Sequence, residues 1–250
     1  MDTVKRFWEV DFLRGIAILM MVIFHILFDL DFYGIHETNM MSGFWMYFGR
    51  ITASLFLLLV GVSLTISLSR QKQLGKTNLF YKYLKRGLKI FSWGLLISLF
   101  TWISLRDGYV RFGILHLIGV SIILAYPLLR YKNLNLLLGI ILVIFGLKVN
   151  EVIIKSPFLL WLGIRPERFF SVDYYPLLPW FGLILIGIFI GNSFYTNYGR
   201  TVRIPELSNL IPIRFLSYLG KHSLLIYLLH QPLIILLFTL TGLIKFSSLF

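Results

Sequence analysis

The sequence predicts an all-α polytopic membrane protein, a bundle of about seven transmembrane helices. Of its 250 residues, 58% are hydrophobic and only 14% are charged, and the mean hydropathy is +0.81. A soluble domain cannot bury that much apolar surface, whereas a protein threaded repeatedly through a bilayer needs it. Because these apolar runs fill nearly the whole chain, we expect one transmembrane domain over residues 1–250.

Seven apolar runs, each of about the length that crosses a bilayer core, follow one another along the chain. They cover residues 11–32, 44–69, 87–105, 112–129, 133–149, 175–193 and 218–244. The longer connection at 150–174 is expected to hold a short interfacial helix around 158–162. A polar stretch is expected to lead to the last span.

The distribution of Lys and Arg predicts the orientation in the membrane. With a cytoplasmic N-terminus, about sixteen of the 24 cations fall in inner segments or at inner helix ends, as the positive-inside rule requires. Seven spans then put the C-terminus outside, in a multi-pass protein of the cell membrane. The net charge of +13 is accounted for by this topology, and we expect no nucleic-acid partner. The charged N-terminal segment is not that of a cleavable signal peptide, and the lack of cysteine excludes disulfides and thiol catalysis.

Four ionisable residues interrupt the first span. Asp11, Arg14, His25 and Asp29 fall within about 80° of arc on one helix face. Arg14 and His25 are eleven residues apart, a rise of roughly 16 Å. Asp29 is four residues from His25 and is expected to bind one imidazole nitrogen, while Asp11 is placed to pair with Arg14. Such groups at membrane depth usually mark a site, although a stripe that only joins this helix to its neighbours is the alternative.

This pattern, Asp11-Phe-Leu-Arg14-Gly15-Ile-Ala17 followed by His25, resembles the first span of membrane-bound acyltransferases, a superfamily that includes the acyltransferase-3 proteins. Three further stretches resemble the heparan-α-glucosaminide N-acetyltransferase-like group within it. They are FGILHLIGVS at 112–121, VDYYPLLPWFG at 172–182 with GIFIG at 187–191, and LGKHSLLIYLLHQPLI at 219–234. The resemblance covers nearly the whole chain in order. It implies transfer of an acetyl group from cytosolic acetyl-CoA to an amine or hydroxyl of an extracytoplasmic glycan or amino sugar.

The resemblance implies roles for Arg14 and His25, because activity in the acyltransferase-3 proteins depends on their equivalents. Histidine titrates near neutral pH and suits a general base, and Asp29 is expected to orient it as the second catalytic residue. His36 is the alternative base, since some relatives use a histidine in the segment after the first span. Direct transfer and an acetyl-histidine intermediate both remain open.

CoA is an elongated polyanion, so basic residues are expected to bind it. The donor-binding candidates are Arg14, Lys85, Arg86, Lys89, Lys221 and His222. The candidates for contacting the acceptor are His36, Arg50, His116, Asp173, Tyr174 and His230. No residue set indicates a metal. Besides the bilayer, acetyl-CoA and the acceptor, a homodimer is the remaining partner considered. A transporter for a small polar or anionic solute is the alternative function, although no internal repeat favours it, and a purely structural membrane subunit is the third.

Overall fold

The computed structural model describes residues 6–244 and divides the chain into two compact units. Among the described residues, unit 1 holds 6–59 and 204–244, and unit 2 holds 60–203. The chain passes from unit 1 to unit 2 within one long helix and returns after Arg203. The single domain expected from the sequence is not tested by this division and stays a prediction.

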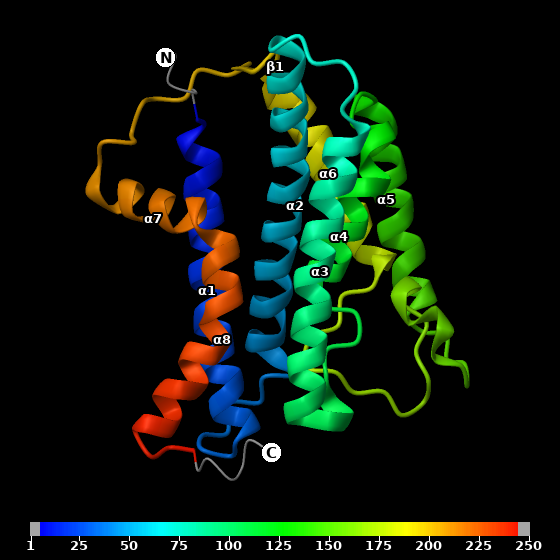
Figure 1. The fold of residues 1–250 in the computed structure, drawn as a ribbon, viewed down its shortest axis with the longest axis vertical. Coiled ribbons are helices and arrows are strands. Elements are labelled where there is room, and N and C mark those ends of the chain that lie inside the picture. Colours follow the sequence, from blue (N-terminus) through cyan, green and yellow to red (C-terminus); the bar gives the residue numbers. More distant parts are fainter. Residues whose placement is uncertain (1–5, 245–250) are drawn as a thin grey trace. The chain divides into compact units, whose positions relative to one another are not determined.

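Unit 1 is built from α1 (Trp8–Phe32), the first part of α2 (Gly43–Gln73), α7 (Ile211–Lys221) and α8 (Ser223–Leu240). Figure 1 shows α7 lying across α1, while α8 runs beside α1. The core at the far end of α8 consists of Ile234, Phe238 and Ile244. Half-buried apolar side chains from the end of α1 and the following turn, including Ile26 and Leu30, pack against this core.

Unit 2 holds the rest of α2 and four further helices with short connecting elements. These are α3 (Phe80–Leu105), η1 (Arg106–Gly108), α4 (Ile114–Ala125), η2 (Tyr126–Leu128), α5 (Lys132–Val149), η3 (Pro157–Leu162), α6 (Leu177–Phe194), β1 (Tyr195–Thr196) and β2 (Gly199–Arg200). The closest helix pairs are α5 with α6 and α3 with α4. The two strands form an antiparallel hairpin in which Tyr195 pairs with Arg200.

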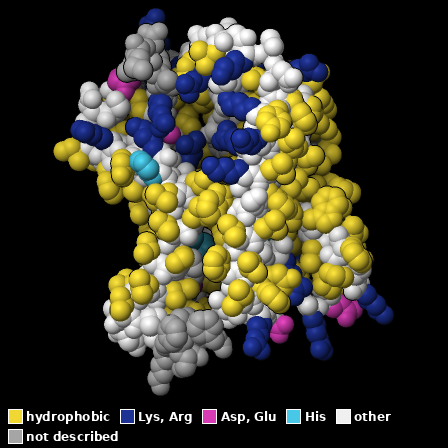
Figure 2. All heavy atoms as spheres, viewed as in Figure 1, with side chains coloured by type: hydrophobic (Ala, Val, Ile, Leu, Met, Phe, Trp, Pro, Cys, Tyr) yellow, Lys and Arg dark blue, Asp and Glu magenta, His cyan; other side chains and the backbone are white. Residues whose placement is uncertain are grey.

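Six helices within residues 6–244 are long and apolar enough to cross a membrane: α1, α2, α3, α5, α6 and α8. The remaining apolar helix, α4 continued by η2, is shorter and runs antiparallel to α3 (Figure 1). Figure 2 shows hydrophobic side chains over the long sides of the helices, while Lys and Arg gather near helix ends, notably where α2 ends and α3 begins. The all-α polytopic membrane fold predicted from the sequence is therefore confirmed.

Two of the helix boundaries that differ from the sequence-based expectation bear on the candidate residues. The last apolar run, 218–244, is broken at His222, and residues 211–221 form the separate helix α7. This helix is amphipathic: Ser217 and Gly220 are buried, whereas Ile211, Phe215 and Tyr218 are exposed. Because polar and apolar residues alternate around such a helix, its mean hydropathy is too low for a search for long apolar runs to find it. The third helix begins at Phe80 rather than 87, which places the basic residues of 82–89 on the helix itself. The short helix expected around 158–162 is η3.

Glycine permits backbone contact between α1 and α7 in unit 1. A Cβ on Gly15 would collide with the carbonyl oxygen of Leu216, and one on Gly220 would collide with that of Asp11. Small residues at such crossings allow helices to approach closely, which is the main source of helix association inside a bilayer. The contact fixes α7 on the part of α1 that carries Asp11 and Arg14.

Unit 2 uses the same device at several helix pairs. A Cβ on Gly87 of α3 would meet the carbonyl oxygen of Gly119 of α4 at 2.7 Å. A Cβ on Gly182 of α6 would meet that of Gly139 of α5 at 2.6 Å. On the second part of α2, Gly61 faces the backbone of α6 around Ile184. These helices therefore associate through backbone contact, which requires glycine at the crossing.

The contact at Gly15 makes a prediction about stability. Gly15→Ala should lower the free energy of unfolding by about 1–3 kcal/mol, the range typical of overpacking, because a backbone oxygen cannot move aside as a flexible side chain can. The melting temperature of the detergent-purified protein measures the effect. Gly199→Ala is the matched control, since the nearest atom to its Cβ, the carbonyl oxygen of Thr196, lies 3.5 Å away. Equal melting temperatures for both variants would contradict the contact.

Candidate active site

The four ionisable residues predicted to share a face of the first span do lie on the single helix α1, and two are fully buried. Asp11 is 8% exposed and Asp29 is 3% exposed, while Arg14 and His25 are half-buried. Inside a membrane protein such groups need partners within the chain. The partners of each side chain therefore indicate what it can do.

His25 is held by the backbone of its own helix. Its Nδ1 lies 2.9 Å from the carbonyl oxygen of Met21, one turn earlier. A carbonyl oxygen only accepts hydrogen bonds, so Nδ1 carries the proton and donates it. The other ring nitrogen, Nε2, is then left with a free lone pair. This is the tautomer that a general base needs.

The predicted hydrogen bond between Asp29 and His25 is wrong. Both carboxylate oxygens of Asp29 instead accept from Nε2 of Gln231 on α8, each at 2.8 Å. One imidazole nitrogen, Nδ1, is instead bonded to the carbonyl oxygen of Met21 in the preceding turn. A carboxylate that is 97% buried also needs a donor, and the facing helix supplies it. Asp29 therefore joins α8 to α1 and does not orient His25 directly.

His230 lies against His25, with ring centroids 4.7 Å apart and an interplanar angle of 81°. It is 8% exposed. Its Nδ1 bonds the carbonyl oxygen of Tyr227 at 2.6 Å, so this histidine has the same tautomer as His25. Its Nε2 is buried without a hydrogen-bond partner in the described part of the chain, as is Oε1 of the adjacent Gln231. Both rings thus present an Nε2 lone pair.

The basic candidates of unit 1 gather near the start of α1. Nη1 of Arg14 lies 3.1 Å from Oδ1 of Asp11, which confirms the pairing expected from the sequence. Gly220 contacts the backbone at Asp11, so Lys221 and His222, the next two residues, lie at the same level of the helix. Both are exposed. This group of Arg14, Lys221 and His222 is called the basic cluster below.

Two further candidates of unit 1 stand apart from these contacts. His36, the alternative base, is exposed in the turn after α1, where its backbone N–H donates to the carbonyl oxygen of Leu30 at 3.2 Å. Arg50 is exposed on α2. No hydrogen bond or ring contact brings either side chain to His25 within residues 6–244. Their predicted roles remain predictions.

The three candidates of unit 2 make contacts that hold loops to α4. Nδ1 of His116 accepts the N–H of Gly113 at 3.2 Å, the opposite tautomer to that of His25. Oδ2 of Asp173 accepts the N–H of Ile114 at 3.2 Å, which caps α4 from a distant loop. The hydroxyl of Tyr174 donates to the carbonyl oxygen of Leu160 at 2.7 Å, and burial raises the pKa of Tyr174 to about 12. The predicted contacts of these three residues with an acceptor stay predictions.

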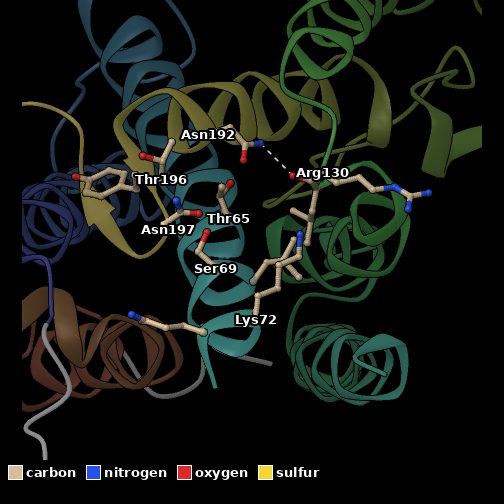
Figure 3. A pocket seen from close by; sticks show the side chains of 11 residues that line it. Thr65, Ser69, Lys72, Arg130, Asn192, Thr196 and Asn197 are labelled. Atoms are coloured by element: carbon tan, nitrogen blue, oxygen red, sulfur yellow. Dashed lines mark hydrogen bonds between the residues drawn. The ribbon is translucent and has the colours of Figure 1, made fainter. Parts of the chain in front are cut away.

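Unit 2 also carries a polar pocket that sequence reasoning missed. Lys85, Arg86 and Lys89, the predicted donor-binding residues of this unit, are exposed on α3 and do not line it. The pocket has a volume of about 470 Å³ and takes polar groups from α2, α6 and the β hairpin (Figure 3). Its polar lining residues include Thr65, Ser69, Lys72, Arg130, Asn192, Thr196 and Asn197. These residues are spread over 133 sequence positions, from Thr65 to Asn197, so no local sequence motif predicts the pocket.

Two contacts organise this pocket. Nδ2 of Asn192 donates to the carbonyl oxygen of Leu129 at 3.0 Å. The guanidinium of Arg130 stacks on Tyr131, 4.8 Å from the ring centroid, and extends away from Asn192 in Figure 3. Lys72 and Arg130 are the two cationic residues that line this pocket. Elsewhere in the described chain, no group of three or more His, Cys, Asp or Glu residues could hold a metal ion.

The comparison with protein families decides the identity of the chain. The model described as heparan-alpha-glucosaminide N-acetyltransferase, catalytic, matches residues 6–232. The chain belongs to this N-acetyltransferase family. No curated protein and no solved structure shows a significant match. The matched residues include those of the α1–α8 contact described above, from His25 to Gln231, and also Arg14.

Membership of the heparan-α-glucosaminide N-acetyltransferase family confirms the family predicted from the motifs. Together with the apolar helices, it supports a membrane-bound acetyltransferase, and it indicates an enzyme. The transmembrane helices agree with a membrane-embedded N-acetyltransferase, while the orientation of its termini stays a prediction.

The hydrogen bond of Gln231 makes the second prediction. Gln231→Leu should destabilise this N-acetyltransferase by about 1–3 kcal/mol, because a buried carboxylate loses its donor. Adding Asp29→Leu should recover part of the loss, since no unpaired polar group then remains. Thermal unfolding of the two single variants and the double variant measures the coupling. Additive losses would show that the two side chains do not interact.

Proposed function

We propose that the chain transfers the acetyl group of cytosolic acetyl-CoA to an amine or hydroxyl of an extracytoplasmic glycan or amino sugar, with His25 as the general base. The observation that carries the proposal is the bond from Nδ1 of His25 to the carbonyl of Met21. It leaves the Nε2 lone pair of a half-buried imidazole available for a proton. Membership of the N-acetyltransferase family supports the reaction class.

The transfer needs one proton to leave the nucleophile and one to reach the departing sulfur. Nε2 of His25 takes the proton as the acceptor nitrogen or oxygen attacks the thioester carbon, and the carbon–sulfur bond then breaks. The imidazolium returns its proton to the thiolate, which leaves as CoA. The bond to Met21 keeps the ring in place and the correct nitrogen free throughout. Asp29 contributes by holding α8 through Gln231.

The basic cluster is proposed to bind the donor. Arg14 lies eleven residues, about 16 Å along the helix, from His25. This separation suits a donor whose thioester reaches His25 while its pantetheine or phosphates remain near the start of α1. Lys221 and His222 lie at that level of the helix because Gly220 contacts Asp11. Arg14 is also paired with Asp11, which limits the positions that its guanidinium can take.

The catalytic proposal is tested by acetyl transfer in proteoliposomes, with glucosamine as a simple acceptor and CoA release as the readout. His25→Gln should lower kcat by about 100- to 10,000-fold, the usual contribution of a general base, while acetyl-CoA affinity changes little. His36→Gln is the matched comparison, since that histidine is exposed and outside the contact. Full turnover by the His25 variant together with loss in the His36 variant would assign the base to His36.

The donor proposal is tested by calorimetric binding of acetyl-CoA to the detergent-purified protein. Lys221→Gln should weaken binding several-fold, and the effect should shrink at high salt because exposed charges are screened. Lys72→Gln, which alters the pocket of unit 2, should bind acetyl-CoA as the unsubstituted chain does. If Lys72→Gln alone weakens binding, the donor phosphates bind the pocket of unit 2.

A further inference from the structure

The contact between His25 and His230 holds an excess of hydrogen-bond acceptors. Nε2 of His25 and Nε2 of His230 both carry lone pairs, and Oε1 of Gln231 is buried without a partner. The Gln231 amide supplies its N–H groups to the carboxylate of Asp29. Buried acceptors without donors are unfavourable, so this cluster is suited to a ligand group that brings several N–H donors and positive charge.

We propose that His230 is a second catalytic residue that takes the first proton from an ammonium acceptor, so that His25 remains free to take the second. This inference rests on the proposed function. An amine arrives at neutral pH largely as R–NH3⁺ and has no lone pair with which to attack. A single imidazole that removed that proton would have no lone pair left for the proton released during attack. With two adjacent imidazoles of the same tautomer, each ring takes one of the two protons.

The proton balance is complete without any further reactant. R–NH3⁺ gives one proton to Nε2 of His230, and the resulting amine attacks the thioester carbon to form the carbon–nitrogen bond. The second proton passes from the nitrogen to Nε2 of His25 and then to the sulfur, as the carbon–sulfur bond breaks. The products are the amide, the free thiol of CoA and one proton, which His230 releases to solvent after the turnover.

The groups around His230 come from α1 and from α8 itself. From α1, His25 contacts its ring, and Asp29 is bound to the neighbouring Gln231. On α8 itself, the ring of Tyr227 lies 5.5 Å away. From α7, which also packs on α8, no hydrogen bond or ring contact reaches His230 among the residues described. Asp29 is thus the acidic residue linked to this face through Gln231, and its negative charge attracts the ammonium of an acceptor.

The test compares two acceptors as a function of pH in the unsubstituted chain. Glucosamine must be deprotonated, whereas an alkoxyamine is already neutral at pH 6.5. If the enzyme accepts the ammonium as well as the free amine, the ratio of kcat/KM for glucosamine to that for the alkoxyamine should stay nearly constant between pH 6.5 and 9. If the ratio rises by about 20-fold, following the neutral fraction of an amine whose pKa is near 7.8, the enzyme uses only the free amine and the inference is overturned.

In the His230→Gln variant, the ratio of kcat/KM for glucosamine to that for the alkoxyamine should rise with pH, as it does not in the unsubstituted chain. Its kcat/KM for glucosamine should fall by about 20-fold at pH 6.5 and recover near pH 9, where solvent has deprotonated the amine. Its rate with the alkoxyamine should be close to that of the unsubstituted chain. A loss that is equal at every pH and with both acceptors would show a structural role only. His230→Asn is measured in the same way where the Gln variant does not fold.

Two controls separate this inference from the proposed function. Thr239→Val, on the same helix but outside the cluster, should keep the pH profile of the unsubstituted chain. Absence of transfer by the unsubstituted chain with either acceptor would refute the acetyltransferase proposal itself. Transfer with a pH profile unchanged by His230→Gln would refute only the role of His230.

Discussion

The buried carboxylate of Asp29 is the constraint on which the candidate site depends. An ionisable group that is almost fully enclosed within a membrane-spanning helix is unfavourable unless the protein supplies a donor. Gln231 supplies it from α8, with both carboxylate oxygens at 2.8 Å. This single polar link brings the neighbouring residue, His230, against His25. The acidic residue thus acts through helix packing and not by touching the imidazole it was expected to orient.

A second level of order comes from the backbone. His25 and His230 each donate an N–H to a carbonyl one turn earlier on the same helix. Such bonds fix which nitrogen carries the proton without any carboxylate partner. The helix itself therefore prepares both rings for accepting protons. Meanwhile the glycine crossing of α1 and α7 holds Lys221 and His222 at the level of Arg14, so the two ends of α1 carry different chemistry.

The sequence was sufficient for the features that depend on one helix and insufficient for those that depend on two. Apolar runs predicted the membrane fold, and helical spacing predicted the shared face of Asp11, Arg14, His25 and Asp29 together with the Asp11–Arg14 pair. The partner of Asp29 lies 202 positions away, so no local rule identifies it. The amphipathic helix α7 was missed because alternation of apolar and polar residues cancels in an average over a window. The bond by which Asp173 caps α4 comes from a distant loop, so no local pattern in the sequence predicts it, and the predicted contact of Asp173 with an acceptor stays a prediction.

The helix crossings at glycine also limit the routes that a substrate can take through each unit. At Gly15, Gly87, Gly139 and Gly182, neighbouring backbones approach so closely that a single methyl group would not fit. Such a crossing excludes lipid tails and water alike. Within each unit, a route for an acyl chain or a sugar must therefore bypass these crossings and follow surfaces lined by larger side chains. Within each unit, these crossings act as closed walls between the two helices that each one joins.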